Sequence, residues 1–176
     1  MDLEKIVSIA ELAGEAILEI YSKPESLKIQ HKGDNSPLTE ADLAAHNIIV
    51  EELQKIDDTP IVSEEGNEGD PLSNDTCWLV DPLDGTKEFI KRNGMFTVNI
   101  ALMRRDKNRW HPIFGVVHAP VTKTTWFGGT MKPSERRGSD GSGLMMVNPS
   151  KPPLPVRLVA SGTPVSSTHL RAHETI

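Results

Sequence analysis

Two carboxylates near the middle of the chain are the residues whose types and spacing best suit chemistry. Asp81 and Asp84 belong to the run Asp-Pro-Leu-Asp-Gly-Thr at residues 81–86, which follows the apolar run Trp-Leu-Val. The apolar run predicts a short buried strand that stops at the Asp-Pro step. Negative charge at the end of a buried strand is unfavourable without a partner. Mg²⁺ is small and hard and prefers such oxygen ligands. The run therefore predicts a divalent cation, and a phosphate as the reason for it.

The other residues of this run suit phosphate chemistry. The Leu83 carbonyl lies between the two carboxylates and can join them as a cation ligand. Gly85 lets a phosphate approach backbone N–H groups closely, especially if a helix begins there. The Thr86 hydroxyl can orient an attacking water and relay its proton. Two cations held here could stabilise both the attacking and the leaving oxygen in phosphate hydrolysis.

Two upstream segments bring further candidates. Residues 34–42 (Asp-Asn-Ser-Pro-Leu-Thr-Glu-Ala-Asp) contain Asp42, and residues 63–66 (Ser-Glu-Glu-Gly) contain Glu64. Each candidate also has a purely structural interpretation. Asp42 lies three residues after Thr39, which is the spacing of a helix capping box. Glu64 can belong to a solvated loop, and the two central aspartates can form an Asx turn. These interpretations remain open from the residues alone.

The apolar pattern predicts the elements that position these groups. Helical spacing over residues 3–20 predicts an amphipathic helix that ends near residue 22. A second helix is expected to begin after Thr39 and to bury Leu43, Val50 and Leu53. Strands are predicted at residues 60–63, 77–80, 96–103, 113–118 and 124–127, with a polar loop at 66–76 and a turn at 104–108. Two helices before hairpin-like strands favour an α+β fold with a largely antiparallel sheet.

The C-terminal part of the chain has a different composition. Residues 128–155 are rich in Gly, Pro, Ser and basic residues, so Arg136 and Arg137 are interpreted as part of a solvated loop. The Pro-Pro-Leu-Pro run at 152–155 is typical of a linker. We therefore expect a metal- and phosphate-binding domain over residues 1–152, and a linker with the beginning of another domain over residues 153–176.

Composition excludes several classes of protein. The chain has 176 residues, of which 37% are hydrophobic, which is enough for a packed core. Lys and Arg total 19 against 25 for Asp and Glu, so the net charge of −6 argues against nucleic-acid binding. Cys77 is the one cysteine, so no internal disulfide can form. The sequence shows no signal peptide and no apolar run of the ~20 residues that span a membrane. We expect a cytoplasmic protein.

Taken together, the motifs resemble those of a known superfamily. The Asp-Pro-Leu-Asp-Gly-Thr run, preceded by Trp-Leu-Val and Ser-Glu-Glu, resembles the first signature of the inositol monophosphatase superfamily of lithium-sensitive, magnesium-dependent phosphatases. The segment at residues 34–42 is similar to the upstream motif of that superfamily. Residues 87–102 resemble the CysQ branch, the bacterial 3'(2'),5'-bisphosphate nucleotidases. The resemblance implies an αβαβα sandwich, of which this chain would supply the N-terminal layer, two helices packed on the sheet.

The resemblance implies a role for each candidate residue. The Mg²⁺ ligands would be Glu64, Asp81, the Leu83 carbonyl and Asp84. The substrate phosphate would be held by Leu83, Asp84, Gly85 and Thr86, with Glu64 close by. Asp42 and Thr86 would position and activate the attacking water, and together with Glu64 they would form the catalytic group.

The resemblance also implies a substrate. Adenosine 3',5'-bisphosphate would lose its 3'-phosphate to give AMP, and 3'-phosphoadenylyl sulfate would be a second substrate, both in sulfate assimilation. The first alternative is an inositol- or sugar-phosphate phosphatase of the same superfamily. The second is a non-catalytic fragment that binds a divalent metal or a partner. For the location, the resemblance implies that the cytoplasmic protein can also associate peripherally with the inner membrane.

One family feature has no counterpart in this sequence. Family members carry a Trp-Asp pair in a second α/β domain, where the Asp completes a metal site, and no Trp-Asp pair occurs here. The adenine contacts of the family also come largely from that second domain. We therefore expect a C-terminally truncated chain with partial Mg²⁺ binding and little phosphatase activity. We also expect self-association through the face that normally packs on the second domain.

Overall fold

A computed structural model describes residues 1–23, 29–31, 37–107, 109–138 and 145–146. The helices are α1 (Leu3–Tyr21), α2 (Glu40–Gln54) and α3 (Thr86–Lys91), with a 3-10 turn at Pro71–Ser73. The strands are β1 (Ile29–His31), β2 (Pro37–Thr39), β3 (Ile61–Ser63), β4 (Gly66–Glu68), β5 (Thr76–Asp84), β6 (Thr97–Asp106), β7 (Arg109–Ala119), β8 (Thr124–Gly128), β9 (Glu135–Arg137) and β10 (Met145–Met146). No helix in this described part is long and apolar enough to cross a membrane.

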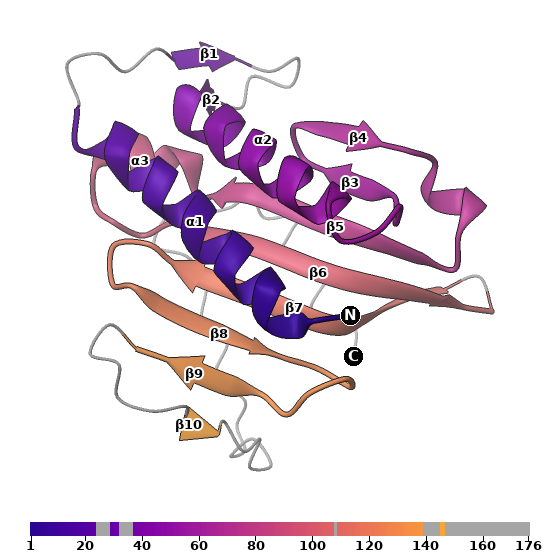
Figure 1. The fold of residues 1–176 in the computed structure, drawn as a ribbon. Coiled ribbons are helices and arrows are strands. Elements are labelled where there is room, and N and C mark those ends of the chain that lie inside the picture. The colour runs from indigo at the N-terminus through magenta and orange to yellow at the C-terminus, as the bar shows by residue number, and fades with distance from the viewer. Residues whose placement is uncertain (24–28, 32–36, 108, 139–144, 147–176) are drawn as a thin grey trace, which may run out of the picture.

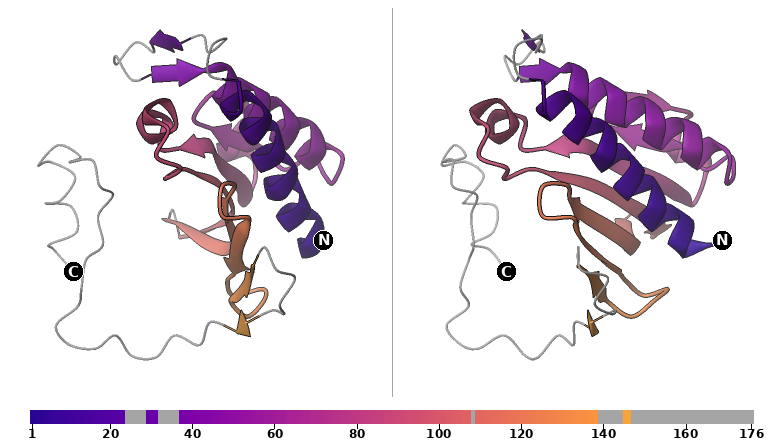
Figure 2. Two further views of the ribbon diagram at one scale, coloured as in Figure 1. Left: turned by 90° about the vertical axis from the view of Figure 1, so that its left-hand side faces the viewer. Right: turned by 60° about the vertical axis from the view of Figure 1, so that its left-hand side comes forward.

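The main sheet has eight strands in the order β10-β9-β8-β7-β6-β5-β3-β4. All its neighbouring pairs are antiparallel except β3 and β5, which are parallel. Helices α1 and α2 lie side by side across one face of this sheet (Figure 1). The short α3 sits at the end of β5, and β1 and β2 form a separate hairpin (Figures 1 and 2). The predicted α+β class, with two helices on a largely antiparallel sheet, is confirmed.

Both long helices begin where the sequence predicts. The Asp2 side chain accepts the Glu4 N–H at 3.1 Å and so caps α1. Thr39 caps α2, and the expected capping box with Asp42 is present. The prediction for the buried face of α2 was wrong for Leu43, which is 37% exposed.

The buried face of α2 follows a different register from the predicted one. Its fully buried apolar residues are Ala41, Ala45, Ile49 and Leu53, and Val50 is only partly buried. The spacing of four residues places one narrow stripe toward the sheet. Small alanines at two of these positions allow α2 to approach its neighbours closely. The sheet contributes the rest of the core between the helices, chiefly through Trp78, Val80, Val98, Ile100, Phe114 and Val116.

Strand β5 continues beyond the point where it was expected to stop. It runs to Asp84, pairing Asp81 with Asn99 and Asp84 with Thr97 of β6. The register shifts between these two pairs, and Pro82 lies within the irregular stretch. Proline has no N–H to donate, so it is tolerated in a sheet at such an irregularity. The Asp-rich run is therefore an irregular strand end held by β6.

The basic residues near the end of the described chain are not part of a solvated loop. Strand β9 pairs with β8 and carries Arg137, whose guanidinium contacts Glu4 at 2.7 Å and Glu11 at 3.4 Å. These ion pairs join β9 to α1, which lies far away in the sequence. Strand β4 and the 3-10 turn likewise lie in the segment expected to be loop. The expected domain boundary near residue 152 falls outside the described residues.

Candidate active site

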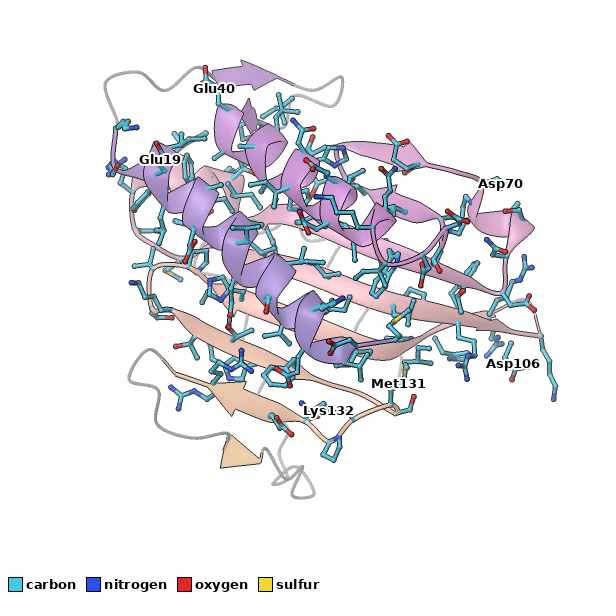
Figure 3. The ribbon with its side chains drawn as sticks, viewed as in Figure 1. Glu19, Glu40, Asp70, Asp106, Met131 and Lys132 are labelled. Atoms are coloured by element: carbon cyan, nitrogen blue, oxygen red, sulfur yellow. The ribbon has the colours of Figure 1, made fainter. Side chains whose placement is uncertain are left out.

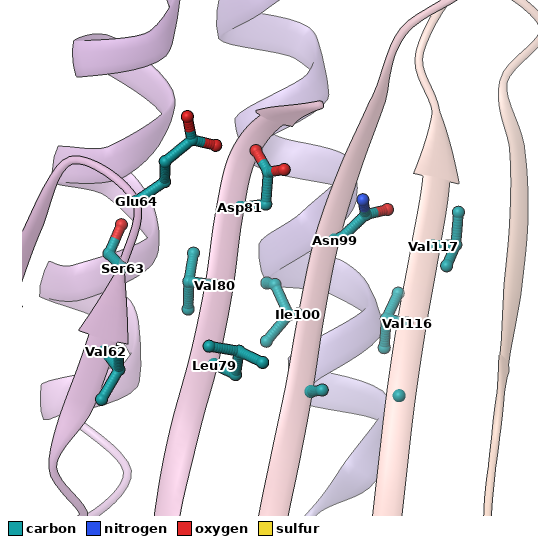
Figure 4. A pocket seen from close by; sticks show the side chains of 12 residues that line it. Val62, Ser63, Glu64, Leu79, Val80, Asp81, Asn99, Ile100, Val116 and Val117 are labelled. Atoms are coloured by element: carbon teal, nitrogen blue, oxygen red, sulfur yellow. The ribbon is translucent and has the colours of Figure 1, made fainter. Parts of the chain in front are cut away.

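The candidate site lies where β3 and β5 end side by side. These two strands are parallel, so Glu64, which follows β3, comes next to Asp81 near the end of β5. The Glu64 N–H donates to the Val80 carbonyl at 3.0 Å, which holds this turn against β5. Figure 4 shows the two carboxylates turned toward each other at this end of the sheet. The parallel pair therefore brings together two predicted ligands from separate motifs.

The Asp81 carboxyl experiences an unfavourable environment when it is ionised. Burial, followed by the negative charges of Glu64 and Asp84, raises its pKa to about 7, while a hydrogen bond from the Leu83 N–H acts in the opposite direction. Its Oδ1 atom is buried and, among the described residues, accepts no hydrogen bond. A buried carboxylate oxygen without a donor, beside other carboxylates, is where a divalent cation would replace the missing positive charge.

The remaining expected ligands lie on the same stretch of β5. Asp84 is exposed, and its Oδ2 accepts the Asn99 side-chain amide at 3.1 Å. The Leu83 side chain is buried, while its carbonyl oxygen lies 3.3 Å from the Thr86 hydroxyl oxygen. Carboxylate and carbonyl oxygens are the donors that Mg²⁺ prefers, so the chemistry of the set fits this ion. Within the described residues, however, no group of three or more His, Cys, Asp or Glu side chains is arranged so that it could hold a metal ion.

Gly85 lies at the N-terminus of α3, so a helix does begin at the turn that could bind phosphate. It precedes α3 with φ 99°, a left-handed conformation that favours glycine. A Cβ atom at this position would lie 2.8 Å from the Met95 carbonyl oxygen, so the backbone also leaves no space for a side chain. Phe89 of α3 packs against Phe96 and Tyr21 with ring centroids 5.3 and 5.2 Å away. This aromatic cluster fixes α3 relative to the sheet.

Asp42 links the second helix to the same turn. Its side chain is 1% exposed, and its Oδ2 accepts the Thr39 N–H at 2.8 Å and the Thr39 hydroxyl at 2.5 Å. Its Oδ1 accepts the Thr86 hydroxyl at 3.0 Å across 44 positions of sequence. The Asp42 side chain therefore both caps α2 and contacts Thr86 at the candidate site. The structure thus brings Asp42 and Thr86 together, although residues 34–36 of the same motif lie outside the described part.

Three residues that the motifs did not single out support the site. Asn99 bonds Asp84, as described above, and the Asn99 amide oxygen accepts the Thr97 hydroxyl at 3.1 Å. His46 Nδ1 lies 2.9 Å from the Ser63 hydroxyl, which also accepts the Glu65 N–H at 3.3 Å. The sequence contained one signal for Asn99. Thr97 and Asn99 interrupt an otherwise apolar strand on alternate positions, which places both on one face.

A hollow of about 520 Å³ adjoins these carboxylates on the sheet face opposite α1 and α2. Cross-strand register explains its shape, because Leu79 pairs with Ala101, which pairs with Gly115. Ala101 and Gly115, the two small residues of this row, leave the floor of the hollow low. Figure 4 shows Glu64, Asp81 and Asn99 at one end and apolar side chains along the rest.

The family of the chain follows from a comparison with protein-family models. The model of the inositol monophosphatase family matches residues 2–176. The chain belongs to the inositol monophosphatase family. The resemblance seen in the motifs is thereby confirmed at the level of the family.

Several members of the inositol monophosphatase family are similar to this chain. The 3'(2'),5'-bisphosphate nucleotidase CysQ of Escherichia coli K12 is 48% identical over 122 residues, which are 68% of this chain and 48% of that protein. CysQ of Salmonella typhimurium is 46% identical over 132 residues, 71% of this chain and 50% of that protein.

Solved structures show the same relationship. The crystal structure of CysQ from Bacteroides thetaiotaomicron has a TM-score of 0.63 and 42% identity, covering 84% of this chain and 51% of that chain. The suhB protein of Bartonella henselae has a TM-score of 0.66 and 26% identity, covering 75% of this chain and 50% of that chain. The chain spans about half the length of the relatives it matches.

Proposed function

We propose that this chain carries the metal- and phosphate-binding part of a magnesium-dependent phosphatase that removes the 3'-phosphate of adenosine 3',5'-bisphosphate to give AMP. The observation that supports this most directly is the meeting of two groups from separate motifs. The carboxylates of Glu64, Asp81 and Asp84 gather at the end of β5, and the Asp42–Thr86 hydrogen bond lies on the following turn. Cation ligands next to a hydroxyl–carboxylate pair suit phosphate hydrolysis.

Bound Mg²⁺, held by Glu64, Asp81, Asp84 and the Leu83 carbonyl, would supply charge to polarise the phosphate and lower the pKa of a water. The Asp42–Thr86 pair would accept the proton that this water loses. Thr86 donates its own proton to Asp42 Oδ1, so its oxygen keeps lone pairs that can accept from the water. The water oxygen would then bond to phosphorus as the bond to the 3'-oxygen breaks. The proton of the water would pass through the Thr86 hydroxyl to Asp42 Oδ1, and the 3'-oxygen would take a proton from solvent.

The nucleotide substrate is supported by the names of the similar proteins. The relatives described above at 46–48% identity are named 3'(2'),5'-bisphosphate nucleotidases. From the motif resemblance alone, we propose 3'-phosphoadenylyl sulfate as a second substrate. Inositol and sugar phosphates are the alternative substrates within the family.

The test is phosphate release by the full-length protein that contains this sequence, in Mg²⁺, with adenosine 3',5'-bisphosphate, 3'-phosphoadenylyl sulfate, inositol 1-phosphate and fructose 1,6-bisphosphate. We expect the two nucleotides to be preferred. Asp84→Asn should lower the rate by about 10³-fold or more, because metal-assisted sites supply at least ~10⁶ of rate enhancement. Asp70→Asn, an exposed cap of the 3-10 turn, is the matched control. Full activity in Asp84→Asn would overturn the proposal, as would a preference for inositol or sugar phosphate.

We also propose that the sheet face opposite the helices associates with a second copy of this chain. Three exposed apolar side chains on that face support this proposal. Leu79 is 48% exposed, Val117 is 41% exposed and Trp126 is 39% exposed. Val117 pairs directly with Trp126, and Asn99 pairs with Val117, so the patch is continuous with the hollow. Sedimentation of the 176-residue chain should show a concentration-dependent dimer that Trp126→Lys weakens. A monomer at all concentrations would contradict this proposal.

A further inference from the structure

Asn99 occupies the point where the carboxylates of β5 meet the neighbouring strand. Its backbone pairs with Asp81, and the next pair along the ladder joins Thr97 to Asp84. Since side chains on alternate positions share a face, Thr97 and Asn99 both point to the side that carries the carboxylates. Figure 4 shows the Asn99 amide beside Asp81 at the end of the hollow. Asn99 is therefore adjacent in space to two of the expected cation ligands.

The Asn99 side chain accepts one hydrogen bond from Thr97 and donates another to Asp84. A carboxylate only accepts, so the amide must present its N–H to Asp84, and it does so from Nδ2 to Oδ2 at 3.1 Å. The amide oxygen then faces the other way, where it accepts the Thr97 hydroxyl at 3.1 Å. The Asp84 carboxylate therefore decides which way the amide faces, and the Thr97 hydroxyl holds the amide in that orientation. Asn99 holds one oxygen of Asp84, and among the described residues the other oxygen accepts no hydrogen bond.

The type of residue at this position matters as much as its place. Asp84 is exposed, so without a partner its side chain would be free to rotate. A lysine or arginine at position 99 would hold Asp84 but would neutralise the charge that attracts a cation. An aspartate would add a fourth carboxylate beside Glu64, Asp81 and Asp84. A neutral amide can orient the carboxylate without altering the charge of the site.

We propose that Asn99 is a positioning residue that holds one oxygen of Asp84 so that the other is presented to the divalent cation, with Thr97 fixing the amide. This inference rests on the proposed function, because it assumes that Asp84 is a cation ligand. Residues that orient a metal ligand usually change metal affinity about 10- to 100-fold when they are removed. A residue that merely supports the sheet would change stability instead.

The experiment is a titration of the protein with Mn²⁺, followed by the electron paramagnetic resonance of the free ion, alongside thermal unfolding in EDTA. We expect Asn99→Ala to weaken Mn²⁺ binding about tenfold while its unfolding temperature in EDTA stays close to that of the wild type. Thr97→Val keeps the amide and should weaken binding less, about threefold. Asn67→Ala, an exposed asparagine on β4, is the matched control and should change neither property.

Three outcomes separate the possibilities. If Asn99→Ala and Thr97→Val both bind Mn²⁺ as the wild type does while Asp84→Asn loses binding, the positioning role is overturned and the metal site stands. If the unfolding temperature in EDTA falls in proportion to the loss of binding in both variants, the role is structural and the proposal is also overturned. If Asp84→Asn binds Mn²⁺ as tightly as the wild type, the proposed function itself fails. In the full-length enzyme, raised Mg²⁺ should restore much of the rate lost by Asn99→Ala.

Discussion

Acidic side chains gather in two regions of the molecule. In one region cations neutralise their charge, and in the other the carboxylates lie next to one another. Where α1 packs beside β9, Glu4 contacts Lys132 at 2.6 Å and Arg137 at 2.7 Å, and hydrogen bonds from these cations lower the pKa of Glu4. Figure 3 shows Lys132 at this edge of the molecule. At the ends of β3 and β5, burial and two further carboxylates raise the pKa of Asp81 to about 7.

The difference separates a structural cluster from a functional one. Charges that serve the fold are satisfied within the chain, as on α1 and β9. Charges that repel one another in the folded state reduce stability and persist where a ligand relieves the repulsion. The contrast predicts that changes in the two regions will have opposite effects on stability.

The largest effect is expected from Asp81→Asn. Without divalent cations at pH 8, the free energy of unfolding should rise by about 2 kcal/mol. A pKa raised from 3.8 to about 7 corresponds to a destabilisation of about 4 kcal/mol, at about 1.4 kcal/mol for each tenfold change in proton affinity. We halve this free energy because water screens the carboxylates. The folded pKa of Asp81 is raised, so the wild type gains stability as the pH falls from about 7 toward 4 and the difference disappears.

Urea unfolding in EDTA at pH 5 and pH 8 measures this difference, with Asp70→Asn as the surface control. Added Mg²⁺ should stabilise the wild type and leave Asp81→Asn nearly unchanged. Lower stability of Asp81→Asn at pH 8 would show that the carboxylates do not repel one another as described.

Gly14→Ala tests how tightly the structural region is packed. A Cβ atom at Gly14 would lie 2.5 Å from Cδ2 of His118, which is 5% exposed on β7. We expect a loss of about 2 kcal/mol, since overpacking costs about 1–3 kcal/mol and alanine returns part of this through helix propensity. Gly115→Ala is the control, because its nearest neighbour would be 4.0 Å away. Equal stability of the two variants in urea would contradict this close packing.

His118 should give the structural region a pH dependence opposite to that of Asp81. Thr125 donates its one hydroxyl proton to Glu11 at 2.9 Å, so His118 must donate from Nδ1 to Thr125. Burial lowers the pKa of His118, and the charges of Glu11 and Glu15 oppose this. The stability contribution is complete above about pH 6.5 and is lost as the pH falls.

Stability should therefore fall between pH 7 and pH 5, and the fall is measured in the Asp81→Asn background so that the site does not offset it. His118→Asn keeps a donor for Thr125 and should flatten the profile in that background. A wild-type slope in this variant would assign the pH dependence to another group.

The smallest effect is expected from Arg137→Ala. Its ion pairs with Glu4 and Glu11 are partly exposed, so their removal should cost about 0.5 kcal/mol at low salt and less in 1 M NaCl. Arg136→Ala removes the same charge from an exposed position of β9. Urea unfolding at the two salt concentrations measures the free energy of unfolding of both variants. An equal loss of stability in Arg136→Ala would show that the ion pairs of Arg137 do not contribute to stability.

Local patterns predicted the parts of the fold that neighbours in sequence decide. The start of α2 at Thr39 followed from the spacing of Thr39 and Asp42, because a capping box involves residues within one turn. The positions of the central strands along the chain were likewise predictable from their apolar runs. The end of β5 and the role of β9 were not, because each depends on a partner strand that no local pattern identifies.

By itself, the sequence determined which groups are available, namely four carboxylates, a hydroxyl and a glycine turn, and it determined the family. Only the tertiary structure decided which of these groups meet. The parallel pairing of β3 and β5 places Glu64 against Asp81, and strand β6 supplies Asn99 to Asp84. The physical reason is that hydrogen bonds between distant strands set these distances. The same long-range contacts give the acids of α1 their cations and leave Asp81 among carboxylates.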